Sequence, residues 1–163
     1  MLEKSGVAAA GQEDSAAAGK VQPSAPRLLV IDDDTLHRMI ICRAAAKAGY
    51  LPAGAATYDE AVRLLQGTAF DCVALDLSLG DHAAVEMLRH FWVIGCKMPI
   101  IIMSDGDDAK CSESEKVAEA LKLNIWESIS KPVDISVLGD LLERLKAARD
   151  CAPDQQSAQV SPA

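Results

Sequence analysis

The sequence has little of what marks secreted, membrane-spanning or nucleic-acid-binding proteins. Its five cysteines are odd in number and lack CxxC spacing (Cys42, Cys72, Cys96, Cys111 and Cys151), which is typical of reduced thiols rather than disulfides or a zinc site. No apolar run is long enough to cross a membrane, and residues 1–20 lack a signal-peptide core. The net charge of −8 disfavours nucleic acid, which requires a basic face. We therefore expect a cytoplasmic protein without membrane or nucleic-acid partners.

The 163 residues suit a single domain flanked by two tails. Residues 1–26 are rich in Ala, Gly and Ser and show no sustained period, and residues 150–163 have a similar character. Such segments bury too little apolar surface to offset the entropy lost on ordering. The sequence predicts a flexible tail over 1–26, an ordered domain over 27–149 and a second flexible tail over 150–163.

Within the ordered domain, short apolar runs alternate with segments of helical period. The expected strands are "RLLVI", "LPAGA", "FDCVALD", "MPIIIMS" and "NIWESIS", and Pro52 places the second of them at a sheet edge. The expected helices cover 35–48, the segment after Thr57, 83–95, 112–123 and the segment after Asp134. Five strands alternating with five helices predict an α/β fold whose parallel sheet is covered on both faces.

Helical spacing also predicts which side chains face the core. In the third helix Val85, Leu88 and Trp92 recur at helical spacing. In the last helix the same reasoning selects four leucines at i, i+3, i+4 and i+7, namely Leu138, Leu141, Leu142 and Leu145. Val117 and Leu121 are likewise expected to pack in the core rather than to bind a ligand.

Polar residues follow four of the five expected strands. The first strand is followed by Asp32 and Asp33, and the third ends at Asp76. Ser104 ends the fourth strand, and Lys131 follows the fifth. Because function in open parallel sheets gathers at the carboxyl ends of the strands, these side chains are expected to form one site.

The chemistry of these residue types is coherent. Carboxylates close together repel one another unless a hard cation neutralises them, and Mg²⁺ prefers a few carboxylates with water and phosphate oxygens. One of the carboxylates can then attack a phosphoryl group and form an aspartyl phosphate. Lys131 suits a phosphate as a compact point charge, and the hydroxyl of Ser104 can donate to a phosphoryl oxygen. Asp34 is better explained as a solvated or helix-capping residue than as a ligand.

Four separated segments, "LLVIDDD", "VALDLSLGD", "IIIMS" and "SKPVD", resemble in this order the receiver domain of two-component response regulators. The resemblance covers about residues 27–149. It implies a doubly wound, five-stranded parallel sheet of flavodoxin-like order 2-1-3-4-5 with five helices. It also implies a cis peptide bond between Lys131 and Pro132.

The resemblance also assigns roles by position. Asp32 and Asp33 resemble the acidic metal-binding pair, and Asp76 resembles the phosphoacceptor, which also contacts the metal. The backbone carbonyl of Ser78 would complete the protein ligands of Mg²⁺. Ser104 resembles the switch hydroxyl, and Lys131 resembles the lysine that precedes a proline in the family.

The function implied is that of a single-domain response regulator in a phosphorelay rather than an enzyme. It would receive a phosphoryl group on Asp76 from a sensor histidine kinase or a histidine phosphotransfer protein in a Mg²⁺-dependent reaction. With no effector domain in the sequence, its output would be binding of a downstream protein or transfer of the phosphate onward. The long segment between Ser104 and Lys131 is similar to receivers in proteins that also carry cyclic-di-GMP phosphodiesterase modules.

The sequence departs from the family pattern at three places. Gly80 stands where the family has a proline, and Ala83-Ala84 replace an Asp-Gly turn. Asp105 follows the switch hydroxyl where a small residue is usual. Ser128 stands in place of the aromatic side chain that often rotates on activation, although Trp126 lies two residues upstream.

These departures keep two alternatives open. The first is a pseudo-receiver, an adaptor that binds partners without phosphorylation. The second is a haloacid-dehalogenase-type phosphatase, whose DxDx[TV] motif requires Thr or Val at position 36, whereas this chain has Leu36 and places Thr35 one residue early. The three histidines, His37, His82 and His90, are expected to be structural or exposed, with His82 close enough to Asp76 in sequence to tune the site.

Overall fold

The structure is a computed structural model that describes residues 24–80, 82–105 and 109–151. Most of the two predicted tails and Asp81 of the altered loop lie outside the described residues. The last helix continues to Cys151, so Asp150 and Cys151, which the sequence assigned to the C-terminal tail, belong to a helix. None of the helices in the described ranges is long and apolar enough to span a bilayer.

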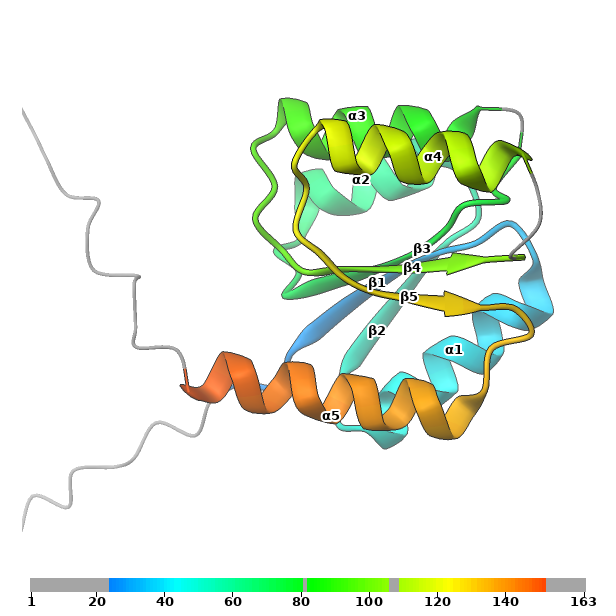
Figure 1. Ribbon diagram of the computed structural model, residues 1–163. Coiled ribbons are helices and arrows are strands. Elements are labelled where there is room, and N and C mark those ends of the chain that lie inside the picture. Colours follow the sequence, from blue (N-terminus) through cyan, green and yellow to red (C-terminus); the bar gives the residue numbers. More distant parts are fainter. Residues whose placement is uncertain (1–23, 81, 106–108, 152–163) are drawn as a thin grey trace, which may run out of the picture.

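Five short strands form one parallel sheet (Figure 1). They are β1 (Arg27–Ile31), β2 (Leu51–Ala55), β3 (Cys72–Asp76), β4 (Ile100–Ser104) and β5 (Ile125–Ser130). Their order is β2-β1-β3-β4-β5, and every neighbouring pair is parallel. The predicted flavodoxin-like order is confirmed, and Pro52 lies in an edge strand, where its missing N–H removes no ladder hydrogen bond.

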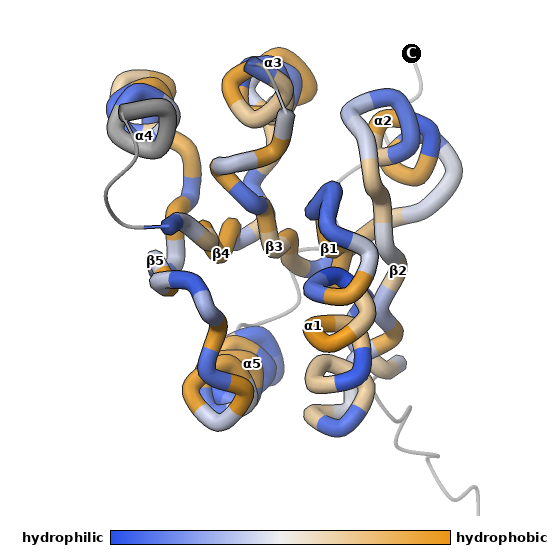
Figure 2. The backbone as a smooth tube through the Cα atoms, turned by 90° about the vertical axis from the view of Figure 1, so that its right-hand side faces the viewer, coloured by the Kyte–Doolittle hydropathy of each residue, from blue (hydrophilic) through white to orange (hydrophobic). Residues whose placement is uncertain are grey.

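Helices cover both faces of the sheet, as Figure 2 shows in a view turned by 90° from Figure 1. α1 (Thr35–Lys47) and α5 (Ile135–Cys151) lie on one face. α2 (Tyr58–Gly67), α3 (Ala83–Val93) and α4 (Ala109–Ala120) lie on the other. A sheet covered in this way must be apolar on both faces, and β3 and β4 are buried along their whole length.

The alternation of side chains along the strands produces two cores. Leu29, Ile31, Val73 and Leu75 pack with the helices of the α2-α3-α4 face, in a cluster that includes Phe91. Their strand neighbours point the other way and pack against four buried leucines of α5, namely Leu138, Leu141, Leu142 and Leu145. The sequence prediction for the last helix is therefore confirmed.

The helices differ from the prediction in several details, and α1 and α3 end at Lys47 and Val93, one and two residues early. Phe91 is completely buried while Trp92 is 58% exposed, because both lie one turn from Leu88 and only one of them fits against the sheet. α4 begins at Ala109, three residues earlier than predicted. It ends at Ala120 rather than Leu123, since Lys122 has a left-handed φ of 51° that terminates the helix.

The edge strand β5 contains an irregularity. Its register against β4 shifts between Ile100, which pairs with Ile125, and Ile101, which pairs with Glu127. Trp126 is the extra residue and is 40% exposed. It lines a hollow of about 350 Å³ with Tyr50 and Arg149 at the amino end of the strands, far from the predicted site residues.

Candidate metal centre

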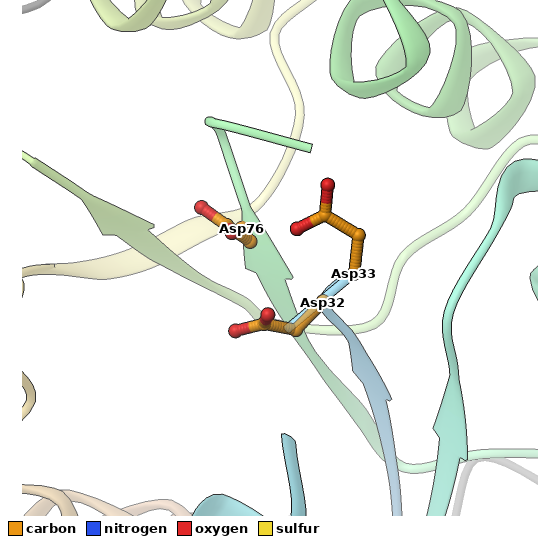
Figure 3. A group of neighbouring side chains, drawn as sticks. All are labelled: Asp32, Asp33 and Asp76. Carbon is orange, nitrogen blue, oxygen red and sulfur yellow. The ribbon is translucent and has the colours of Figure 1, made fainter. Parts of the chain in front are cut away.

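Three carboxylates meet at the carboxyl edge of the central strands. Asp32 follows the last residue of β1, and Asp76 ends the neighbouring strand β3. One ligand oxygen from each of Asp32, Asp33 and Asp76 lies within 4.8 Å of the others (Figure 3). Asp32 is fully buried and Asp76 is 1% exposed, whereas Asp33 is open to solvent. The structure thus brings together the three aspartates that the sequence selected.

The turn after β1 is fixed by hydrogen bonds. The Asp32 N–H donates to the carbonyl of Ala55 at 3.1 Å, which continues the β1–β2 ladder. Asp34 is the N-cap of α1, and its carboxylate accepts from the His37 N–H at 2.8 Å. That backbone hydrogen bond lowers the pKa of Asp34. Asp34 is a cap, as predicted, which leaves Asp32 and Asp33 for the site.

Lys131 is the cation of the site. Its Nζ lies 2.5 Å from Asp76 Oδ2 and 3.7 Å from Asp32 Oδ2. Burial acts to lower the pKa of Lys131, but the hydrogen bond and charge of Asp76, with the charges of Asp32 and Asp105, outweigh it and raise the pKa. The ammonium group is therefore charged at neutral pH. The Lys131-Pro132 peptide bond is cis, as predicted.

Ser78 and Ser104 lie beside the same carboxylate edge. The backbone N–H and the hydroxyl of Ser78 both donate to Asp76 Oδ1, at 2.9 and 2.6 Å. Ser104 is 6% exposed at the end of β4, and its carbonyl accepts from the Lys131 N–H at 2.8 Å. The metal-ligand role of the Ser78 carbonyl and the switch role of the Ser104 hydroxyl remain predictions.

His37 is a site residue that the sequence reasoning missed. Its Nδ1 forms a short hydrogen bond with Asp32 Oδ2. The next residue, Arg38, donates from Nη1 to the Asp32 carbonyl at 2.6 Å. The signal was the position of both residues in the first turn of a helix that starts directly after the aspartates. Gly54 of β2 makes room for this arginine, since a β-carbon there would lie 3.0 Å from Arg38 Cδ.

The residues present fit Mg²⁺. All three side chains offer hard carboxylate oxygens, the donors that Mg²⁺ prefers, and one of the three is open to the solvent from which water ligands come. Two of the three carboxylates are buried, and buried charge is costly unless it is compensated. Lys131 supplies one positive charge beside the three carboxylates, so the site favours a further cation.

The structure also locates the residues at which the sequence departs from the family pattern. α3 still begins at Ala83, and Ala84 is buried, so replacement of the Asp-Gly turn leaves the helix in place. Asp105 is exposed and acts on the site through its charge on Lys131. Ser128 is exposed on the edge strand β5.

Comparison with known proteins identifies the family. A model described as the response regulator receiver domain matches residues 28–143. The chain belongs to the response regulator receiver family. Receiver domains are signalling domains of two-component systems, and the acidic cluster of this receiver lies at the carboxyl edge described above.

Curated relatives of this receiver are longer proteins. It is 27% identical over 135 residues to the transcriptional regulatory protein ZraR of Salmonella typhimurium, with 82% of this chain and 30% of that protein covered. It is 31% identical over 130 residues to the response regulator MprA of Mycobacterium sp., with 79% and 53% covered. The chain thus spans about a third to a half of the length of these relatives.

Solved structures show the same fold at low sequence identity. A CheY-like receiver domain protein from Methanospirillum hungatei has a TM-score of 0.64 at 23% identity, with 78% of this chain and 98% of that chain covered. The receiver domain of an HD domain-containing protein from Pseudomonas fluorescens has a TM-score of 0.66 at 18% identity, with 78% and 99% covered. These matches agree with the strand order of the sheet.

Proposed function

We propose that this receiver accepts a phosphoryl group on Asp76 from the phosphohistidine of a sensor kinase or phosphotransfer protein. The observation that carries the proposal is the position of Asp76. It is buried between two other carboxylates and the ammonium group of Lys131, which lies 2.5 Å from its Oδ2. A carboxylate held beside a fixed cation, within a cluster suited to a metal ion, has the surroundings that phosphoryl transfer requires.

The transfer itself needs little covalent chemistry from the protein. A carboxylate oxygen of Asp76 forms a bond to phosphorus while the P–N bond of the donor breaks and the imidazole departs. Both oxygens of Asp76 accept hydrogen bonds, one from Ser78 and the other from Lys131. The nucleophile is therefore already oriented, and a phosphoryl oxygen arriving there meets the charge of Lys131.

The Mg²⁺ ion would be held by the side chains of Asp32, Asp33 and Asp76 and by the backbone carbonyl of Ser78. When bound, it would neutralise the carboxylates and the oxygens of the incoming phosphoryl group. Ser104 would donate its hydroxyl to a phosphoryl oxygen once Asp76 is phosphorylated. The surface formed by β4, α4 and β5 would then shift between two populations that partners distinguish.

The surface beside the site suits a protein as the phosphodonor. Exposed apolar side chains occur on the two helices that begin shortly after Asp33 and Lys131. They are Leu36, Met39 and Ile40 on α1 and Ile135 and Val137 on α5. Apolar groups that stay exposed next to a reactive centre are typical of a docking surface. The function as a separate single-domain regulator, its cytoplasmic location, its downstream partner and any link to cyclic-di-GMP remain predictions.

A pseudo-receiver is the second candidate, and the turn after β3 is the observation that favours it. His82 takes a left-handed φ of 62° there, and its side chain makes no capping hydrogen bond to α3. The phosphatase alternative has less support, because Leu36 is 62% exposed on the surface of α1 rather than directed at the carboxylates.

The test is to incubate the protein with Mg²⁺ and acetyl phosphate and to record its intact mass. Wild type should gain one acid-stable, base-labile phosphate, and Asp76→Asn should gain none. The matched control is Asp140→Asn, an exposed aspartate on α5, which should behave as wild type. Sustained hydrolysis of many phosphoesters would replace the proposal with a phosphatase. No phosphate in the wild type, together with no chemical-shift response to beryllofluoride, would replace it with the adaptor.

A further inference from the structure

The buried carboxylate of Asp32 is held from several directions. Its Oδ1 accepts from the Asp34 N–H at 2.9 Å. Its Oδ2 accepts from His37 Nδ1 and lies 3.7 Å from Lys131 Nζ. Rotation of the carboxylate about its Cβ–Cγ bond would break these contacts, so they fix one orientation of the two oxygens.

Packing alone does not account for a histidine at position 37. The side chain is 19% exposed, and its second ring nitrogen, Nε2, is buried without a hydrogen-bond partner among the described residues. Burying an unpaired ring nitrogen is unfavourable, and an aliphatic side chain of similar size would avoid it. What the imidazole provides, and an aliphatic residue cannot, is the hydrogen bond from Nδ1 to Asp32.

We propose that His37 is a positioning residue that orients the Asp32 carboxylate for the divalent cation. The inference rests on the proposed metal site. It adds a residue outside the ligand set whose loss weakens cation binding without removing a ligand. Hydrogen-bond partners of metal ligands act in this way, because they fix the ligand in its binding geometry before the ion arrives.

The geometry gives His37 this role rather than that of a ligand. The set of mutually close ligand atoms consists of Asp32, Asp33 and Asp76 and does not include a nitrogen of His37. Each carboxylate oxygen has two lone pairs. Asp32 can therefore accept from His37 and Asp34 and retain a lone pair on each oxygen for the cation.

The experiment measures Mg²⁺ affinity by isothermal titration calorimetry on the full chain. His37→Leu is expected to weaken binding by about tenfold or more, as is usual when a hydrogen-bond partner of a metal ligand is removed. His37→Asn keeps an N–H donor near the position of Nδ1 and is expected to lie closer to wild type. Arg43→Gln changes an exposed residue of the same helix and should leave the affinity unchanged.

Thermal unfolding supplies a readout that separates positioning from a merely structural role. A ligand that binds only the native state stabilises it by RT ln(1 + [L]/Kd), so a weaker-binding variant gains less Tm at the same ligand concentration. At one fixed Mg²⁺ concentration, the rise in Tm should therefore be smaller for His37→Leu than for wild type. A structural role would instead lower Tm equally with and without Mg²⁺, and this result would overturn the proposal.

The remaining outcomes are also decisive. Equal affinity of wild type and His37→Leu, or tighter binding by the variant, would overturn the positioning role, and tighter binding would show that His37 competes with the cation. If the wild type itself binds no Mg²⁺, the proposed metal site fails, and the positioning role fails with it. A wild type that binds Mg²⁺ beside an unaffected variant rejects the role of His37 alone.

Discussion

The two turns that carry the acidic residues differ in how they are held. After β1, the chain enters α1 through a side-chain cap, in which the Asp34 carboxylate accepts from the His37 N–H. The Arg38 side chain also donates a hydrogen bond to the Asp32 carbonyl. After β3, the chain enters α3 through His82, which has a left-handed φ of 62° and no side-chain cap among the described residues. The first turn thus enters its helix through a side-chain cap, and the second, in the described part of the chain, enters its helix without one.

This difference matches the chemistry that each turn must perform. Asp32 is fully buried, so its charge requires partners that do not move, because an uncompensated buried charge is strongly unfavourable. The turn after β3 lies next to the proposed phosphoacceptor, where a phosphoryl group must enter and leave. It is also the turn in which Gly80 replaces the proline of the family pattern.

Removal of the cation that joins the two turns should have the largest effect. Lys131→Met leaves Asp76 and Asp32 without their shared ammonium group. We expect the free energy of unfolding to fall by about 1–3 kcal/mol. This loss is smaller than that for breaking a fully buried ion pair, because 14% of the Lys131 side chain is exposed. Urea unfolding measures this, and Mg²⁺ should restore part of the loss.

The pH dependence of this effect follows from the raised pKa of Lys131. A group whose pKa is higher in the folded state contributes stability below its unfolded pKa and loses it as pH rises through the folded value. The difference in the free energy of unfolding between wild type and Lys131→Met should thus be constant from neutral pH up to about the ordinary pKa of 10.5 and shrink above it. Lys116→Met, an exposed change on α4, should give no difference at any pH.

Relief of the left-handed backbone should have a smaller effect of opposite sign. His82→Gly is expected to raise the free energy of unfolding by up to about 1 kcal/mol, because glycine adopts positive φ without a steric cost. Lys122→Gly, at a φ of 51° in the turn after α4, is the matched control and should gain a similar amount. Only His82→Gly should change the rate of phosphorylation by acetyl phosphate.

A loss of stability in His82→Gly would contradict this expectation. It would mean that the histidine side chain stabilises the turn through contacts that outweigh the strain of its backbone. The second turn would then be held as firmly as the first, and the contrast between the two would disappear.

Loss of the helix cap should have the smallest effect. Asp34→Ala removes the acceptor for the His37 N–H, so we expect a modest fall in Tm, and Asp34→Ser should retain most of the stability because serine also caps helices. The backbone hydrogen bond from His37 lowers the pKa of Asp34 below its ordinary value of 3.8. The stability that the cap contributes is therefore present above pH 3.8 and is lost as the pH falls through the pKa of Asp34 in the folded state. A Tm difference from Asp34→Ala that persists unchanged to lower pH would contradict the assignment.

Much of the fold was predictable because burial on both faces leaves a strong signal. The apolar runs "LLVI" and "IIIM" exceed what a half-exposed strand needs, and the leucines of α5 recur at helical spacing. The choice between Phe91 and Trp92 was not predictable from spacing, because both are compatible with one helical face. The left-handed backbone at Lys122, which terminates α4 after Ala120, was also not predictable from the sequence, since lysine rarely adopts that conformation.

The same limit applies to the site. Asp32, Asp33 and Asp76 could be selected because each stands at a strand end, and the ends of adjacent parallel strands are necessarily close. The position of His37 in the first turn of α1 places it near the aspartates, but its contact with Asp32 also depends on the direction in which α1 leaves the sheet, which the sequence pattern does not give. The role of Arg38 likewise required the position of Gly54 on the neighbouring strand.

Gly54 means that a substitution on the edge strand β2 can affect a side chain that contacts the acidic cluster. Gly54 lies on β2, a strand that contains none of the three aspartates of the cluster and no charged residue. Even a methyl group at this position would lie only 3.0 Å from Cδ of Arg38, the residue that donates to the Asp32 carbonyl. A Gly54→Ala substitution on this edge strand would therefore require the Arg38 side chain, which donates to the Asp32 carbonyl, to shift.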